Sequence, residues 1–394
     1  MSDVWQETIT NAEVLRRDLH AHPELGWQEY RTAERIRDTL STLNIAWRSC
    51  AGTGTLAWLN PAGKGPTIAL RGDIDALPII ENTQKEWSSE NLGCMHACGH
   101  DGHAATLLAA ARWLKYHEDL LPGPVTLIFQ PAEEGGHGAR EMIADGALEG
   151  VDAIFGWHNW PAIPFGKLVC PDEIVMCGNG TFEIVVKGRG GHASQPELCR
   201  DPVLAASAIT LNLQQIISRR LAPQQAAVLS VTSIEAPSAP TVIPEQATIG
   251  GSIRVPDKAT RAELNQLIIE VSQQTAASYG VECDVQIWPR YEATINHPMQ
   301  ASLIREHWQS LFGLGSLHTD IRLPIMASED FSYYLQEIPG AFALIGSDDG
   351  PEHQAPCHSA HYDFNDRLIP LVMALFSRLS GAPVPEELSH VGKT

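Results

Sequence analysis

The sequence lacks several features that would assign it to a specialised class of protein. Its 394 residues contain no apolar run of about 18 residues, the length that predicts a membrane-spanning helix. The N-terminal stretch MSDVWQETITNAEVL is polar and amphipathic, without the apolar core of a secretory signal. Basic residues are scarce, with 27 Lys and Arg against 47 Asp and Glu, so a net charge of -20 argues against nucleic acid or an anionic membrane as a partner.

Compact disulfide spacing and a phosphate-binding loop are also missing. Gly63-Lys64-Gly65 has none of the remaining residues of a P-loop. Because the cysteines show no compact disulfide spacing, we expect free thiols in a reducing cytoplasm, where they can bind metal. A hydrophobic content of 44% and a charged content of 19% describe an ordinary globular protein, long enough for two domains. The eight cysteines stand at positions 50, 94, 98, 170, 177, 199, 283 and 357.

One stretch concentrates reactive side chains, residues 96–103, which read HACGHDGH. Five of these eight residues can bind a metal or transfer a proton, and two glycines let the backbone bend. Cys98 and His100 are two residues apart, so in an extended or looped backbone their side chains point to the same side. Residues 104–117 carry the apolar stripe of a helix. We expect this cluster to lie on a loop that leads into the helix. Whether the cluster is a metal site depends on matching ligands elsewhere in the sequence.

Matching side chains follow four predicted strands, at 67–71, 125–130, 153–157 and 341–346. Helices between these strands indicate a mostly parallel sheet with helices on both faces. In such sheets ligands bind beyond the carboxyl ends of the strands. The side chains brought to this rim are Asp73, Asp75, Glu133, Glu134, His158, His358 and His361.

The N-terminal part predicts two helices, at 3–20 and 28–43, joined by the break HPELG at 22–26. Arg16 and His20 near this break can be functional or structural. A helix-loop-helix explains them without an active site, and we therefore interpret them as structural.

A second pattern begins at about residue 178. Its predicted elements follow the order β-α-β-β-α-β, which is typical of a ferredoxin-like sandwich. We predict that 179–295 form a domain inserted into a catalytic domain of 1–178 and 296–394. The strands are expected at 181–187, 226–235, 246–255 and 281–288, and the helices at 201–219 and 258–279.

The rim has enough donors for a dinuclear metal site, which needs about four to six ligands, one of them shared. Their mixture of thiolate, imidazole and carboxylate suits two ions of zinc, manganese, cobalt or nickel. The candidate ligands are Cys98, His100, Glu134, His158 and His358.

Three further carboxylates have expected roles around these ligands. Asp75 and Asp101 are predicted to orient the imidazoles. Glu133, next to a ligand but not itself one, is placed to be the general base for a water between the metals. Alternatively, Glu133 and Glu134 form a solvated pair at the start of the next helix, favoured by its dipole. The ligands at the other strand ends favour the metal site.

Six motifs together resemble the family of aminoacylases, hippurate hydrolases and indoleacetyl-amino-acid hydrolases, dinuclear metalloamidases within the aminoacylase and carboxypeptidase group. The resemblance extends from Arg71 to Phe364, through both predicted domains. The motifs are HACGHDGH (96–103), FQPAEEG (129–135), GWHNWP (156–161), GRGGHASQP (188–196), SEDFSYY (328–334) and HSAHYDF (358–364).

This resemblance implies the five ligands named above, with Cys98 bridging, and Glu133 as the base. It also implies that the inserted domain is a lid and dimerisation unit, whose His192 helps to stabilise the oxyanion, often across a homodimer. Arg254 is a candidate for binding a substrate carboxylate through its guanidinium, with a surface salt bridge as an equal alternative.

Three residues depart from the family pattern: Glu197, Cys199 and Cys357. We interpret Cys357 as a small buried residue. If Glu197 faces the substrate, its carboxylate would favour an N-acetylated diamino acid; a solvent-facing Glu197 is the favoured alternative.

The sequence therefore predicts a metal-dependent amidohydrolase that removes the acyl group from an N-acyl amino acid or a small amino-acid conjugate. The alternatives are a dipeptidase or carboxypeptidase on the same site, and a deacetylase of N-acetylated diamino acids. A metal-binding protein without turnover is disfavoured, because it has no need of a free Glu133. We expect a small-molecule substrate and a homodimer or higher homo-oligomer.

Overall fold

The computed structural model describes residues 2–385 and divides the chain into two compact units. Unit 1 comprises Met1–Val175, Ile295–Arg322 and Asp330–Thr394, and unit 2 comprises Met176–Thr294 and Leu323–Glu329. None of the helices in the described part of the chain combines the length and the apolar character needed to cross a membrane.

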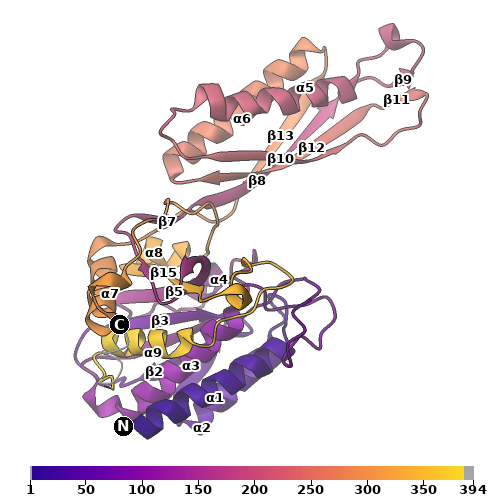
Figure 1. The fold of residues 1–394 in the computed structure, drawn as a ribbon. Helices are drawn as coiled ribbons and strands as arrows, with labels where there is room; N and C mark the ends of the chain where they lie inside the picture. The colour runs from indigo at the N-terminus through magenta and orange to yellow at the C-terminus, as the bar shows by residue number, and fades with distance from the viewer. Residues whose placement is uncertain (1, 386–394) are drawn as a thin grey trace. The chain divides into compact units, whose positions relative to one another are not determined.

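Unit 1 is built on a seven-stranded sheet (Figure 1). Its strands are β1 (Ala46–Cys50), β2 (Gly54–Leu59), β3 (Ile68–Asp73), β4 (Val125–Gln130), β5 (Ala153–Pro164), β6 (Leu168–Val169) and β15 (Gly340–Asp348). Their order is β1-β2-β4-β3-β5-β15-β6. The four strands from β4 to β15 run parallel, whereas β1, β2 and β6 pair antiparallel with their neighbours. The mostly parallel sheet that the sequence predicts is thus present, with antiparallel strands added at both edges.

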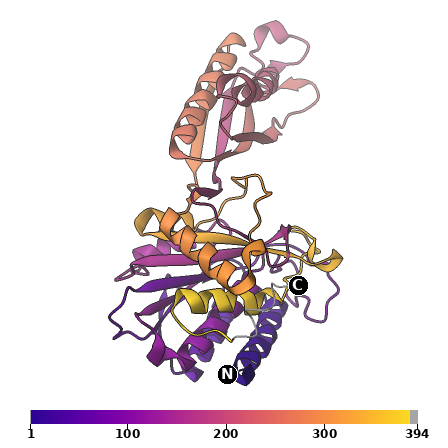
Figure 2. The ribbon, with the colours of Figure 1, turned by 60° about the vertical axis from the view of Figure 1, so that its left-hand side comes forward.

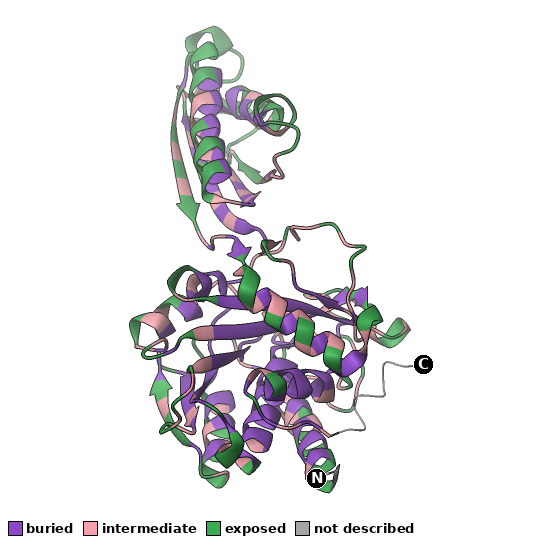
Figure 3. Cartoon of the chain, turned by 90° about the vertical axis from the view of Figure 1, so that its left-hand side faces the viewer, coloured by how far each residue is buried: buried purple, intermediate pink, exposed green. Residues whose placement is uncertain are grey.

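Helices cover both faces of this sheet. On one side lie α1 (Ser2–Ala21), α2 (Tyr30–Thr42), α3 (His100–Tyr116) and α9 (Leu368–Leu379), and on the other α4 (Gly138–Ala144) and α8 (Ser332–Glu337) (Figure 1). The helix α7 (Pro298–Phe312) packs against β15 and α9 (Figure 2). The centre of this layer is α3, which is buried over most of its length because α1, α9 and β3 pack around it (Figure 3).

The strand β3 is the point where the chain changes the direction in which it adds strands. From β3 it passes through α3 to β4 on one side, and then through α4 to β5 on the other side. Such switch points leave a crevice at the carboxyl ends of the strands. Here β5 pairs with β3 only as far as Phe155, so the sheet opens beside residues 157–159.

Unit 2 is an antiparallel sheet with two helices packed on it. Its order along the chain is β-α-β-β-α-β, the ferredoxin-like order that the sequence predicts, and its strands lie in the order β10-β12-β8-β13. The elements are β8 (Gly178–Lys187), α5 (Pro202–Gln215), β10 (Val228–Glu235), β12 (Gln246–Val255), α6 (Lys258–Ser278) and β13 (Glu282–Pro289), with β9 (Gly191–His192) and β11 (Val242–Ile243) forming a separate two-stranded ribbon. The short strands β7 (Ile174–Met176) and β14 (Thr294–Ile295) lie where the chain passes between the units.

Two element boundaries differ from the prediction in ways that affect the reactive side chains. The helix α3 begins at His100, so the second half of the HACGHDGH stretch is helical rather than a loop. Gly99 precedes it with φ 97°, a left-handed conformation that glycine adopts without strain. The strand β5 extends to Pro164, so His158 lies inside the strand rather than after it.

Candidate metal centre

The five predicted ligands come together in unit 1 as two groups that share one residue. A ligand atom of Cys98 lies within 4.8 Å of one atom each of His100 and His158. Cys98 also lies within 4.8 Å of ligand atoms of Glu134 and His358. Two cations held by these groups would have three protein ligands each and Cys98 in common, which leaves coordination positions for substrate or water. This arrangement supports the bridging role that the resemblance implies for Cys98.

The two groups differ in exposure. Cys98, His100 and His158 are buried, whereas the side chain of His358 is 52% exposed and that of Glu134 is 16% exposed. The Nε2 atom of His358 lies 3.1 Å from Oε1 of Glu134, and the Sγ atom of Cys98 lies 3.3 Å from Nε2 of His158. One group is therefore enclosed by protein, and the other is open to a molecule arriving from solvent.

Backbone conformation sets the direction of two of these ligands. His358 has φ 68°, which is unusual for a residue other than glycine, and its N–H donates to the carbonyl of Ala97 at 2.7 Å. This bond ties the chain around His358 to the segment that carries Cys98. The turn after β4 also contains a residue with a positive φ angle. This residue is Ala132, which precedes Glu133 and Glu134 and has φ 52°.

Hydrogen bonds behind the imidazoles fix which ring nitrogen faces the centre. The Nδ1 atom of His100 lies 2.9 Å from the carbonyl oxygen of Asp75 and 3.2 Å from its carboxylate. The Nδ1 atom of His158 lies 2.6 Å from the carbonyl of Asn159. Both rings therefore keep Nε2 for a metal. The prediction for Asp75 agrees with this contact.

The prediction for Asp101 differs from its contacts. Its carboxylate points toward α1, where it lies 2.8 Å from Nδ1 of His20 and 3.7 Å from the guanidinium of Arg16. As the second residue of α3, Asp101 faces away from His100 on the helix surface, so it orients α1 and not a ligand.

Behind the ligands runs a buried network that residue spacing did not reveal. Arg71 binds Asp73 at 2.5 Å, and the other oxygen of Asp73 lies 2.6 Å from Nδ1 of His103. The Nε2 atom of His103 then lies 2.7 Å from Asn159, whose amide donates to Tyr362. Through these contacts His103, the last residue of the HACGHDGH stretch, links β3, α3 and β5.

The carboxylates of this site create a negative electrostatic environment that favours a bound cation. Although burial opposes it, Asp73 and Asp75 raise the pKa of His100 to about 10. A hydrogen bond to Cys357, together with burial and the charges of Glu134 and Glu133, raises the pKa of the Cys98 thiol well above its usual range. A bound divalent cation reverses both effects, because it favours thiolate and neutral imidazole.

The donor atoms fit such a cation. The Nε2 atom of His100 is buried, lies 3.6 Å from Asp73, and has no hydrogen-bond partner among residues 2–385. A buried imidazole nitrogen without a partner is costly unless it binds a metal or water. One thiolate, three imidazoles and one carboxylate form a donor set suited to zinc and similar divalent ions.

Glu133 is buried beside these ligands. One of its oxygens lies within 4.8 Å of ligand atoms of His100 and Glu134. It also accepts the backbone N–H of Asp330 at 3.3 Å. The Asp330 carboxylate accepts from Arg71, Gln130 and the backbone of Ala139. These contacts hold Asp330 in place beside Glu133.

The other predicted site residues belong to unit 2. His192 is exposed on β9, opposite Val242, and its Nδ1 lies 2.8 Å from the hydroxyl of Ser194. Glu197 is exposed in the short 3₁₀ helix Pro196–Leu198. Arg254 is half-buried on β12 and donates to the carbonyl of Ile253. Their roles remain predictions.

Cys357 is half-buried, next to His358. Its Sγ atom lies 4.0 Å from the carbonyl of Cys98 and 3.9 Å from the side-chain amide of Asn159. Cys199 is buried in unit 2, with its Sγ atom 3.7 Å from the carbonyl of Gln195.

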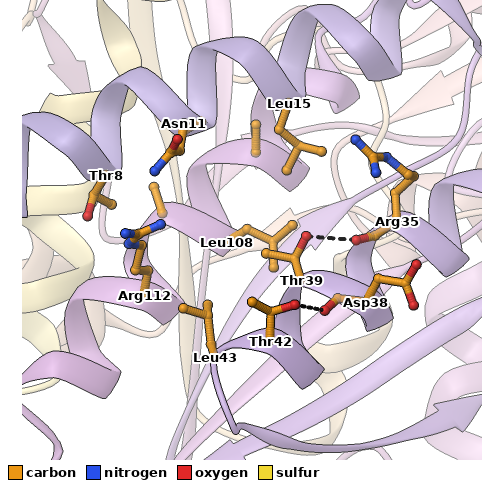
Figure 4. A pocket seen from close by; sticks show the side chains of 13 residues that line it. Thr8, Asn11, Leu15, Arg35, Asp38, Thr39, Thr42, Leu43, Leu108 and Arg112 are labelled. Carbon is orange, nitrogen blue, oxygen red and sulfur yellow. Dashed lines mark hydrogen bonds between the residues drawn. The ribbon is translucent and has the colours of Figure 1, made fainter.

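A pocket of about 240 Å³ lies elsewhere in unit 1, between α1, α2 and α3 (Figure 4). Two of its threonines bond the backbone of their own helix, Thr39 to Arg35 and Thr42 to Asp38. The charged side chains Arg35 and Arg112 pair with the carboxylates of Asp18 and Glu7. None of the residues that line this pocket is among the candidate metal ligands.

Comparisons with known proteins agree with the geometry. The model of peptidase family M20/M25/M40 matches residues 69–380. The chain is 39% identical over 380 residues to "IAA-amino acid hydrolase ILR1-like 2" of Arabidopsis thaliana, covering 95% of this chain and 85% of that protein. It is 39% identical over 335 residues to "N-acetyl-L-cysteine deacetylase" of Bacillus subtilis, covering 85% and 80%. A crystal structure of the Bacillus subtilis YXEP protein, a dinuclear metal-binding peptidase, superposes with a TM-score of 0.82 at 33% identity, covering 95% and 98%.

Proposed function

From the premise that the chain belongs to peptidase family M20/M25/M40, we propose that it hydrolyses the amide bond of N-acyl amino acids or small amino-acid conjugates. The chain is a divalent-metal enzyme and a hydrolase of amide bonds. The single observation that carries the proposal is the pair of ligand groups sharing Cys98, with the carboxylate of Glu133 beside them.

In this proposal Cys98, His100 and His158 would hold one cation, and Cys98, Glu134 and His358 would hold the other. When bound, two divalent cations polarise an amide carbonyl and lower the pKa of water. Zinc, manganese, cobalt and nickel all suit the donor set.

Glu133 is the proposed general base. It takes the proton of the water that attacks the amide carbon, and then delivers this proton to the leaving amine. The backbone N–H of Asp330 and the enclosed position of Glu133 hold its carboxylate in one orientation. Its neighbour Glu134 points to His358, so the two adjacent carboxylates have separate tasks.

His192 of unit 2 is the proposed donor to the oxyanion that forms on the amide carbonyl. An exposed imidazole in a short ribbon is available to a substrate, and its Nδ1 atom is engaged by Ser194, which leaves Nε2 as the donor. Arg254 and Glu197 are proposed to contact the rest of the substrate, Arg254 through a carboxylate and Glu197 through an amine.

We further propose that unit 2, as a lid and dimerisation domain, joins two copies of the chain, and that the enzyme acts in the cytoplasm. Apolar side chains on the outer face of α5 support the dimer, because Leu204 and Leu211 are 56% and 73% exposed. Sedimentation velocity of the wild type and of Leu204→Glu tests this, and a monomeric wild type would contradict it.

The function is tested with a panel of substrates on metal-free protein reloaded with zinc, manganese, cobalt or nickel. The panel contains N-acetyl-leucine, N-acetyl-cysteine, hippurate, an indoleacetyl amino acid, N-acetyl-diaminobutyrate and a dipeptide. We expect metal-dependent hydrolysis of the acyl amino acids to exceed that of the dipeptide. Faster dipeptide hydrolysis would instead support the dipeptidase or carboxypeptidase alternative.

A further inference from the structure

The loop between α1 and α2 lies against the turn that carries Glu133 and Glu134. Gly26 approaches Ala132 so closely that a Cβ atom on Gly26 would lie 3.2 Å from the Cα atom of Ala132. The ring N–H of Trp27 donates to the carbonyl of Gly136 at 3.2 Å. One carboxylate oxygen of Glu29 accepts the backbone N–H of Ala132 at 2.9 Å. Three residues of one loop therefore contact the two ends of the turn.

This turn needs support from outside. Ala132 has φ 52°, a conformation that is strained for a residue with a side chain and persists only where surrounding contacts hold it. Its carbonyl accepts the N–H of Gly138 at 3.1 Å, and its N–H is bound by Glu29. Two residues later, the N–H of Glu134 donates to Asp75 at 2.9 Å. Two carboxylates thus bind the backbone on either side of Glu133.

The side chain of Glu29 is committed to this task. It is the N-cap residue of α2, a position where a short polar side chain commonly accepts N–H groups of its own helix, yet Glu29 makes no such bond. Glu24 accepts the N–H groups of Arg31 and Thr32 instead. The second oxygen of Glu29 accepts the hydroxyl of Thr53 at 2.7 Å.

Glu29 is fully buried, so both oxygens are used inside the protein. Burial and the charge of Asp75 raise the pKa of the Glu29 carboxyl to about 7. In either protonation state one oxygen can accept the N–H of Ala132, and a glutamine at this position keeps that acceptor.

We propose that Glu29 is a positioning residue for the reaction: through the N–H of Ala132 it sets the turn that aims Glu133 at the substrate and Glu134 at a metal. This inference rests on the proposed function. It assigns a task to the helix-loop-helix segment that the sequence alone presents as ordinary structure. Glu29 touches neither substrate nor metal.

The test is a titration of metal-free protein with Co²⁺, followed by visible absorption, together with kcat and KM for the best acyl amino acid. For Glu29→Ala we expect a Co²⁺ dissociation constant raised about 10- to 100-fold and kcat lowered by a similar factor, with KM changed less than about 3-fold. Glu29→Gln should stay within about 3-fold of the wild type in each quantity.

Two further variants keep the test decisive. Glu24→Gln removes a charge from the same loop without touching the turn, and it should bind Co²⁺ as the wild type does. Glu29→Asp keeps the charge, but its side chain is one methylene shorter and cannot reach the N–H of Ala132 in the same way. We expect this variant to bind Co²⁺ more weakly than the wild type. It replaces Glu29→Ala in the test if Glu29→Ala does not fold.

Wild-type Co²⁺ affinity and kcat in folded Glu29→Asp and Glu29→Ala would overturn the inference. So would an equal loss in Glu24→Gln. If the wild type itself neither binds Co²⁺ nor hydrolyses an acyl amino acid, the proposed function fails instead, and the two failures are distinguishable.

Discussion

The two units of the chain differ in how many ionisable side chains they bury. Unit 1 buries a cluster of ionisable groups, including Arg16, His20, Arg71, Asp73 and His100. In unit 2, among residues 178–289, Arg261 is the only buried side chain with a formal charge, and the core between sheet and helices is aliphatic with one phenylalanine. The residue proposed for catalysis there, His192, lies on the surface.

This difference follows from the topology of each sheet. Antiparallel strands with helices on one face bury an apolar layer and leave the other residues in water. A parallel sheet with a switch point brings several strand ends to one crevice, where polar side chains meet. Buried charges of this kind are costly unless they pair or bind a cation. The candidate ligands Cys98, His100, Glu134, His158 and His358 accordingly all belong to unit 1.

The largest expected effect is the loss of the shared ligand. Cys98→Ala should abolish amide hydrolysis and lower the metal content measured by elemental analysis, because Cys98 belongs to both candidate ligand groups. Cys283→Ala, on β13 of unit 2, is the matched control and should retain metal and activity. Full activity with unchanged metal content in Cys98→Ala would disprove the bridging role.

Glu133→Gln separates catalysis from metal binding inside unit 1. The variant should keep its metal and fold while kcat falls by at least about 10²-fold, the lower range for loss of a general base. Glu134→Gln should lose metal. If the two variants behave in the opposite way, the assigned roles are exchanged.

His192→Ala tests whether unit 2 contributes chemistry without binding metal. We expect kcat to fall by about 10²-fold, as for a lost oxyanion donor, with metal content unchanged. If the imidazole acts across a dimer, mixing His192→Ala with Glu133→Gln chains should restore activity, since one hybrid site then has both residues. Wild-type kcat would show that His192 has no such part.

The buried charges of unit 1 predict a pH-dependent stability. Although burial opposes it, Asp101 raises the pKa of His20 from 6.5 to about 9, and Glu81 adds to this shift. The stabilisation is fully present below pH 6.5 and is lost as pH rises through 9. In urea unfolding of metal-free protein, the advantage of wild type over His20→Gln should shrink by roughly 3 kcal/mol between these pH values.

His22→Gln, at the end of the same helix, controls for the loss of a histidine. An advantage of wild type over His20→Gln that stays constant from pH 6 to 9 would contradict the charged state of His20.

The smallest expected effect concerns specificity in unit 2. Glu197→Gln should lower kcat/KM for N-acetyl-diaminobutyrate by several-fold relative to N-acetyl-leucine, because a carboxylate favours an ammonium group and its amide does not. Steady-state kinetics at low ionic strength measures this ratio, since salt screens an exposed charge. An unchanged ratio, or a wild type that prefers apolar substrates, would remove Glu197 from the site.

The local pattern of the sequence is sufficient for the four parallel strands of unit 1 and for the β-α-β-β-α-β order of unit 2, whereas the edge strands β1 and β6 were not predicted. Apolar periodicity and turn residues predict the bounds of strands such as β4 and helices such as α6 to within a few residues. These bounds can be predicted because they depend mainly on residues that are close together in the sequence. The predicted start of α3 was wrong, because residues 100–103 were interpreted as part of the loop although they form the first turn of the helix.

The sequence by itself determined which donors are candidates, because motifs beside the predicted parallel strands contain Cys98, His100, Glu134, His158 and His358. Only the tertiary structure decided how these donors divide into two groups around Cys98 and that Asp101 turns to α1. It also decided that Glu29 binds Ala132, a residue 103 positions away. Contacts of that kind depend on the order of strands in the sheet and on the packing of helices across it, and no local periodicity encodes either.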